Sequence, residues 1–167
     1  MTALANFLAH AVALEAESVE RYDELADAME VHNNREVADL FRQLAKFSRL
    51  HLAEVTQAAS AYELPKLKPW EYQWQTPEAP ESTPTERTHY RMTPFHCIHL
   101  ALTNERRGHQ YYADVAYKAA DPEIRKMAAE FAAEEAGHVA MLEKWAARIP
   151  EPAADWDYDP DPPAVTD

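Results

Sequence analysis

Four long segments of the chain place apolar side chains at intervals of three and four residues, and none has a proline in its interior. This spacing is typical of amphipathic α-helices, which an interior proline would break. The sequence has 12 prolines but only 2 glycines, a poor composition for a sheet protein that needs many tight turns. We therefore expect an all-α fold, and the length of 167 residues favours one domain with a self-sufficient core.

The breaks between these segments set the predicted helix boundaries. The predicted helices cover residues 3–31, 34–62 and 95–120, followed by a fourth that starts at Asp121-Pro122. Asn34 is expected to cap the second helix, and Asp121 the fourth, because short side chains with an acceptor oxygen satisfy free amides at helix starts. Each helix of the first pair has about 28 residues, which corresponds to ~42 Å.

The remaining segments differ in composition from the helices. Residues 63–94 contain six prolines, and alternating aromatics that include Trp70 and Trp74, so we expect an extended crossover whose tryptophans lie against the helices. The last segment, 150–167, is acidic and proline-rich and is expected to form a surface strap or a disordered tail. The predicted organisation is thus a helical bundle over residues 1–149 with a C-terminal tail.

A hairpin pattern occurs twice in the sequence. Residues 34–51 align without a gap on residues 121–138, and a Glu followed seven residues later by a Tyr precedes each copy. The matched pairs are Val37 with Ile124, Leu44 with Phe131, Ser48 with Glu135, His51 with His138, Glu15 with Glu105 and Tyr22 with Tyr112. Two similar hairpins joined by a long crossover predict a four-helix bundle with the connectivity of the ferritin-like class.

Three of these matched residues are carboxylates on otherwise apolar helical stripes: Glu15, Glu105 and Glu135. A carboxylate buried alone costs several kcal/mol or takes up a proton, so each needs a compensating cation. Glu135 and His138 lie one helical turn apart on one face, the Glu-x-x-His spacing that di-metal bundles use to hold an ion between facing helices. The pattern therefore predicts a metal centre at mid-depth, with His51 as a further ligand.

Simpler interpretations exist for each of these residues. Glu135 and His138 could be an exposed charge pair, and His51 a hydrogen-bonded core histidine. Glu17 follows Glu15 closely enough that a small error of helical phase would exchange their roles. The equivalent positions in the repeat favour the metal-centre interpretation.

The repeated Glu, Tyr and His, with Glu135-x-x-His138 in the second copy, resemble the rubrerythrin branch of the ferritin-like superfamily over residues 3–148. The resemblance implies a carboxylate-bridged centre of two iron ions that reacts with peroxide or oxygen. It further implies that Glu15 and His51 hold one metal, Glu105 and His138 the other, and that Glu135 bridges them. It also implies a homodimer.

Two positions depart from that family pattern. Ser48-Arg-Leu-His51 stands where the first Glu-x-x-His is expected, so one bridging carboxylate is missing. Gly108 stands where rubrerythrins have a second glutamate of the third helix. His109, one turn beyond Glu105, could supply a substitute nitrogen ligand, could hydrogen-bond a ligand, or could be partly exposed. The single cysteine, Cys97, excludes a rubredoxin-type iron centre, so an enzyme of this kind needs a separate electron-donor protein.

These departures leave three functions open. The first is an oxidoreductase acting on peroxide or oxygen, the second a metal-binding protein without redox turnover, and the third a metal-free structural bundle. Iron is the expected metal, while manganese or zinc would also suit imidazole and carboxylate ligands, and the centre could hold two ions or one.

Further predictions concern two tyrosines, the cysteine and the remaining histidines. Tyr22 and Tyr112 are most simply core aromatics, whose hydroxyls could hydrogen-bond a ligand carboxylate or take part in catalysis by one-electron chemistry. Cys97 is expected to be an inert, partly buried thiol. The histidines expected at the surface are His10, His32 and His89.

The charge balance restricts possible partners. With 16 basic and 29 acidic residues the formal net charge is −13, which disfavours a nucleic-acid partner. No apolar run approaches the length of a membrane span, and the first residues lack the basic start of a signal peptide. We expect a cytoplasmic protein that does not bind nucleic acid or membrane.

Overall fold

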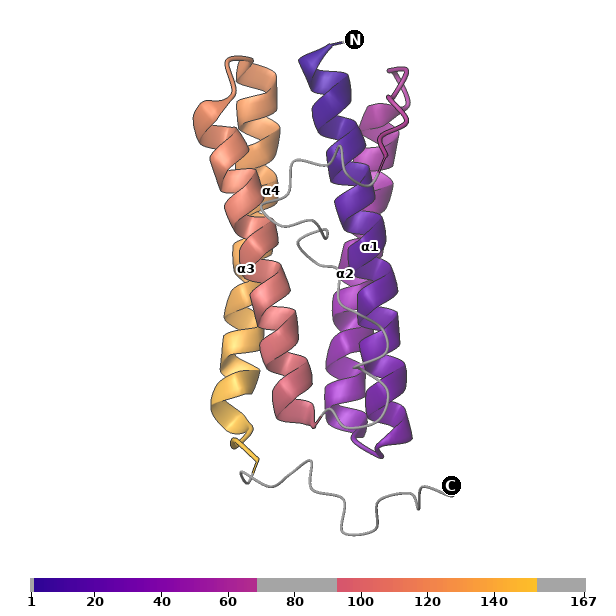
Figure 1. Cartoon of the computed structure of the whole chain (residues 1–167), viewed down its shortest axis with the longest axis vertical. Helices are drawn as coiled ribbons and strands as arrows, with labels where there is room; N and C mark the ends of the chain where they lie inside the picture. The colour runs from indigo at the N-terminus through magenta and orange to yellow at the C-terminus, as the bar shows by residue number, and fades with distance from the viewer. Residues whose placement is uncertain (1, 69–92, 153–167) are drawn as a thin grey trace, which may run out of the picture.

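The computed structural model describes residues 2–68 and 93–152, which form four helices and contain no strand. The helices are α1 (Ala3–Val31), α2 (Arg35–Ala59), α3 (Pro94–Lys118) and α4 (Pro122–Arg148), and they run side by side along the long axis (Figure 1). The predicted all-α, four-helix fold is confirmed. Most of the predicted crossover, with Trp70 and Trp74, and most of the predicted tail lie outside the described residues.

The predicted starts of α2 and α4 are confirmed by their caps. The Asn34 side chain accepts a hydrogen bond from the amide of Val37, and Asp121 accepts one from the amide of Glu123. Between α1 and α2, Asn33 has a φ of 57°, a left-handed conformation that asparagine tolerates better than most residues. This residue turns the chain back on itself and closes the first hairpin.

Three helix boundaries differ from the prediction. Helix α2 ends at Ala59 rather than Tyr62, since Ser60 hydrogen-bonds back to the carbonyl of Gln57 and Pro65 follows shortly after. Tyr62, where the predicted helix ends, lies beyond the observed helix and is exposed. Helix α3 starts one residue early, at Pro94, because Thr93 caps it, and ends at Lys118 rather than Ala120.

The four helices form two hairpins, each tightly packed within itself. Helix α1 packs closely along α2, and α3 along α4, whereas the two hairpins approach each other much less closely (Figure 1). Contacts between the hairpins therefore depend on long side chains that reach across.

Two apolar clusters fill the bundle, one toward each end. The first, near the turn between α1 and α2, includes Leu25, Met29, Phe41, Leu44, Ile98 and Leu142. The second, near the start of α1, includes Phe7, Leu8, Leu14, Val55, Ile124 and Phe131. On every helix the predicted polar site residues fall between the members of these two clusters. The core thus has a polar layer between two apolar ones.

The structure also tests the smaller predictions. His10 was expected at the surface but is 2% exposed, with its Nδ1 2.8 Å from the carbonyl oxygen of Asn6. His32 is exposed as predicted, while His89 lies outside the described residues. Cys97 is completely buried, and burial raises the pKa of its thiol to about 12, which makes it inert. Among the described helices none combines the length and apolarity that a membrane crossing requires.

Candidate metal centre

The polar layer brings together one side chain from each of three helices and two from the fourth. They are Glu15 on α1, His51 on α2, Glu105 on α3, and Glu135 with His138 on α4. They form two groups, Glu15–His51–Glu135 and Glu105–Glu135–His138, and within each group the donor atoms lie within 4.8 Å of one another. Glu135 belongs to both groups, so its carboxylate stands where it can be shared between two ions.

Four of the five side chains are buried, and the fifth, His138, is 13% exposed. Glu15, Glu105 and Glu135 are each 1% exposed, and His51 is 3% exposed. Three carboxylates this close together and this deeply buried repel one another strongly unless positive charge accompanies them. The layer therefore requires protons or metal ions to be stable.

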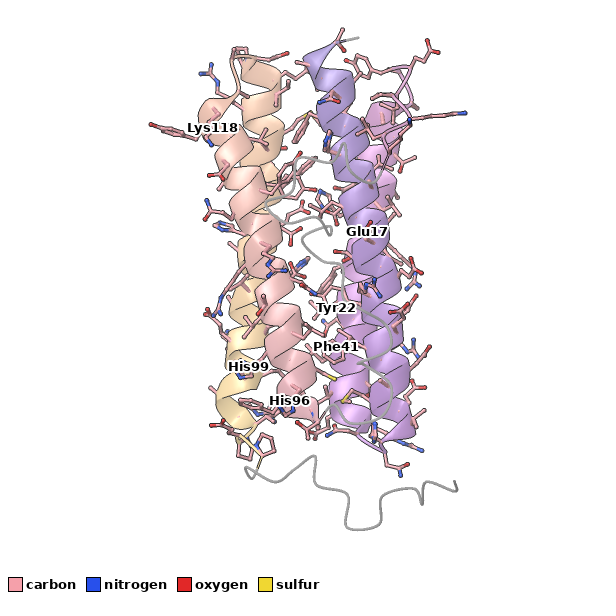
Figure 2. The ribbon with its side chains drawn as sticks, in the orientation of Figure 1. Glu17, Tyr22, Phe41, His96, His99 and Lys118 are labelled. Atoms are coloured by element: carbon pink, nitrogen blue, oxygen red, sulfur yellow. The ribbon has the colours of Figure 1, made fainter. Side chains whose placement is uncertain are left out.

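Two buried tyrosines connect the glutamates across the bundle. The Tyr112 hydroxyl on α3 donates to Oε1 of Glu15 on α1 at 3.0 Å, and the Tyr22 hydroxyl on α1 donates to Oε1 of Glu105 on α3. Figure 2 shows Tyr22 in the space between the first hairpin and α3. Each hydroxyl thus fixes one carboxylate of the opposite hairpin, which is the hydrogen-bonding role considered for these residues from the sequence.

The imidazoles are oriented by carboxylates and by aromatic rings. His51 Nδ1 lies 3.0 Å from Oε1 of Glu15, and His138 Nδ1 lies 3.4 Å from Oε1 of Glu105. Phe131 meets the His51 ring edge-on at 4.5 Å between centroids, and Phe47 stacks on His138 at 6.0 Å. An aromatic ring on one side of each imidazole and a carboxylate on the other orient both imidazoles toward the polar layer.

These surroundings change how the residues bind protons. Burial lowers the pKa of His51, but hydrogen bonding and charge from Glu15, followed by the charge of Glu134, raise it above its ordinary value overall. The pKa of His138 is raised in the same way, with Glu105 as the main partner. Burial by itself would raise the pKa of Glu105, yet its hydrogen bonds with Glu135, His138 and Tyr22 hold it below the usual range. Without bound metal, both imidazoles of the layer therefore hold a proton more readily than a free histidine does.

Some donor atoms in this layer have no hydrogen-bond partner among the described residues, including Nε2 of His51 and Oε2 of Glu105. An unpaired buried polar group costs about 1–3 kcal/mol, so several together favour a bound species that satisfies them. Imidazole nitrogens and carboxylate oxygens without a thiolate suit iron, manganese or zinc. The donor set and its unpaired atoms fit a pair of divalent ions.

Not every residue singled out in the sequence reaches this layer. Glu17, the alternative to Glu15, is half-buried and belongs to neither group. His109 is half-buried on α3 and is likewise outside both groups. Ser48 is 1% exposed and lies one turn before His51, so the hydroxyl stands in the core where the repeat would put a second shared carboxylate.

The structure also shows two acidic residues that the sequence analysis passed over. Glu134 places Oε2 at 3.2 Å from Nδ1 of His51, and the charge of Glu54 acts on the same imidazole. Their helical spacing was the available signal, since Glu54 follows His51 by three residues and Glu134 precedes His138 by four. Both look like ordinary surface charges in the sequence because they lie off the apolar stripes.

The chain is similar to known proteins over most of its length. The rubrerythrin family profile matches residues 6–146. The chain belongs to the rubrerythrin family. A crystal structure of an uncharacterised conserved protein from Magnetospirillum magnetotacticum MS-1 is similar, with 49% identity and a TM-score of 0.78 over 92% of this chain and 99% of that one. No curated protein matches the chain.

The rubrerythrin match covers the whole of the polar layer. All five members of the two donor groups lie within residues 6–146, as do both tyrosines that hydrogen-bond them. The resemblance to rubrerythrins seen in the sequence is therefore confirmed. The chain contains a rubrerythrin-family domain, and this domain holds the candidate metal-binding groups.

Proposed function

We propose that this rubrerythrin-family protein is an oxidoreductase that reduces peroxide or oxygen at a centre of two iron ions. The observation that carries the proposal is the sharing of Glu135 between two buried groups of donors. A carboxylate common to two groups suits a dinuclear centre, whereas a structural ion pair has no need of a second group. Within the proposal, Glu15 and His51 would hold one ion, Glu105 and His138 would hold the other, and Glu135 would serve both.

The chain's own residues would control the reaction through position and protons. When bound, a ferrous pair supplies two electrons, which together with two protons reduce hydrogen peroxide to two water molecules. Tyr22 and Tyr112 hold Glu105 and Glu15 by hydrogen bonds and keep hydroxyl protons beside the centre. The apolar clusters above and below exclude water from the remaining sides. A separate electron-donor protein completes the cycle, and we propose a homodimer in the cytoplasm as the working form.

One observation favours a second candidate, a metal-binding protein without redox turnover. Ser48 is buried beside His51 where the other hairpin has Glu135, so the first hairpin lacks a bridging carboxylate. Carboxylates that shift between ions accommodate changes of charge, and losing one restricts that accommodation. Such a centre could bind ions yet turn over poorly.

Metal analysis followed by a turnover assay tests both candidates. The purified protein is measured for metal per chain before and after anaerobic loading with ferrous iron, and is then supplied with peroxide and an electron donor. Two ions per chain with peroxide consumption support the enzyme. Two ions without consumption favour the binding protein, and no bound metal under any loading condition refutes both and favours a metal-free structural bundle.

A further inference from the structure

A cleft on the surface leads to the candidate metal centre. It lies between α2 and α4, has a volume of about 410 Å³, and its lining includes both histidines of the centre, His51 and His138. Leu50 and Glu54 on α2, and Glu134 and Gly137 on α4, are the exposed parts of its wall. The cleft is thus a connection between solvent and the two imidazoles.

The charged residues of this wall are both acidic. Neither Glu54 nor Glu134 has a lysine or arginine within ion-pair distance among the residues described. The cleft thus carries two carboxylates whose nearest basic group is the His51 imidazole, 3.2 Å from Glu134, and acidic groups in a partly apolar cleft focus the electric field and attract cations.

A second observation points to a ligand at the inner end of the cleft. The His51 side chain is only 3% exposed, and its Nε2 has no hydrogen-bond partner in the described part of the chain. Its Nδ1 lies 3.2 Å from Oε2 of Glu134 on the cleft side and 3.0 Å from Oε1 of Glu15 in the centre. One imidazole therefore contacts a carboxylate of the cleft and a carboxylate of the polar layer.

We propose that the cleft between α2 and α4 is the entrance for the metal, and that Glu54, Glu134 and His51 bind a divalent cation in transit to Glu15 and Glu135. The inference rests on the proposed metal centre and adds a route and a transit site to it. Carboxylate oxygens with one imidazole bind divalent ions of the first transition row. An exposed site with two carboxylates also releases its ion readily, as a transit site must.

The electrostatic part of the proposal is tested by the rate of metal uptake. Metal-free protein is mixed rapidly with cobalt(II) alone, whose ligand-field absorption reports coordination by nitrogen and oxygen. In Glu54→Gln/Glu134→Gln we expect uptake about 10-fold slower than in the wild-type protein, with weaker slowing by added salt. Final occupancy at saturating cobalt stays at two ions per chain, since the inner donors are intact.

A matched control removes the same charge from the same helices outside the cleft. Asp39 is exposed on α2, 15 residues or ~22 Å along the axis from Glu54. Glu143 is exposed on α4, nine residues beyond Glu134 and hence on the opposite face. Asp39→Asn/Glu143→Gln should take up cobalt at the wild-type rate.

The steric part of the proposal has its own variant. A Cβ added at Gly137 would meet no atom within 4 Å, so a leucine there can extend into the cleft without disturbing the helix. Gly137→Leu should slow uptake, whereas Ala136→Leu, on the neighbouring exposed position, should not. Circular dichroism confirms that each variant is folded.

The outcomes separate this inference from the proposed function. Uptake in both cleft variants at the wild-type rate, with two ions bound at the end, overturns the entrance and leaves the centre in place. Failure of the wild-type protein to bind cobalt or ferrous iron at all overturns the centre and the transit site together. Slow uptake in the cleft variants but not in their controls supports the proposal.

Discussion

Substituting glutamine for Glu135 should have opposite effects on the metal-free and the metal-bound protein. Glutamine keeps the size of the side chain and removes its charge, and Glu135 is the residue that both donor groups share. If the polar layer binds metal, the negative charge of Glu135 destabilises the metal-free protein and is needed to hold the ions. A residue with a purely structural role would show the reverse.

The expected size follows from the geometry. Two ionised carboxylates at the 4.8 Å limit of these groups repel by about 3 kcal/mol at an effective dielectric constant of about 20. Glu135 lies this close to Glu15 and Glu105, and a proton in its hydrogen bond with Glu105, together with the imidazoles of His51 and His138, offsets part of the repulsion. We therefore expect the melting temperature of metal-free Glu135→Gln to equal or exceed that of the metal-free wild type.

Metal binding reverses the order. At a free metal concentration 100-fold above the dissociation constant, each ion adds about 2.7 kcal/mol to the stability. Because 1 kcal/mol corresponds to about 2–4 °C in a protein of this size, two ions should raise the wild-type melting temperature by about 10–20 °C. Glu135→Gln should lose this gain, while His138→Ala, which removes a donor from one group, should keep about half of it.

Thermal melts followed by circular dichroism, with chelator and with ferrous iron under anaerobic conditions, measure these differences. Glu143→Gln on the same helix as Glu135, which removes an exposed ion pair with Arg106, is the control, and its melting temperature should gain as much from ferrous iron as that of the wild type. The reasoning is refuted if Glu135→Gln melts lower than wild type without metal and yet keeps the full gain with metal.

Three further changes test separate features. Gly137→Ala should raise the free energy of unfolding, measured in urea titrations, by about 0.5–1 kcal/mol. The reason is that the φ of Gly137 is not positive and a Cβ added there meets no atom within 4 Å. A decrease would contradict the open surroundings of this position. Ser48→Glu should destabilise the metal-free protein, since the site is 1% exposed, but raise metal occupancy or peroxide turnover; no change in either would argue against a lost bridging carboxylate. In the metal-free protein the raised pKa of His51 stabilises the fold fully below about pH 6.5, and this contribution should be lost as pH rises through the folded-state pKa. Urea titrations at increasing pH from about 6.5 should therefore show a falling free energy of unfolding. A rising free energy would contradict the prediction.

The fold was accessible from the sequence because its signals are local and repeated. Caps at Asn34 and Asp121 mark helix starts through the hydrogen bonds that the structure contains. The end of α2 was less predictable, since a terminal turn is decided by small competing interactions such as that of Ser60 with Gln57. His10 was misjudged because a histidine outside the conspicuous pattern gives no sign of the neighbours that bury it.

The polar layer was accessible for a different reason. Periodicity places Glu15, Glu105 and Glu135 on apolar stripes, and the repeat brings equivalent positions to equal depth. Residues that contact the layer from outside the apolar stripes show no such periodicity in the sequence. Glu134 is distinguished from other surface glutamates only by its distance to His51, which depends on how α4 packs against α2. Whether these side chains bind metal stays a prediction.

The loss of symmetry at Ser48 implies that the two ions are held unequally. The group Glu105–Glu135–His138 comes entirely from the second hairpin, whereas the other group has two donors from the first hairpin and borrows Glu135 from α4. Because the hairpins approach each other only loosely, the borrowed donor is the less constrained one. Anaerobic titration should therefore show two steps, with the first ion bound more tightly at the group on α3 and α4. His51→Ala should abolish the weaker step and preserve the tighter one, and a single step of two equal ions in the wild type would contradict this asymmetry.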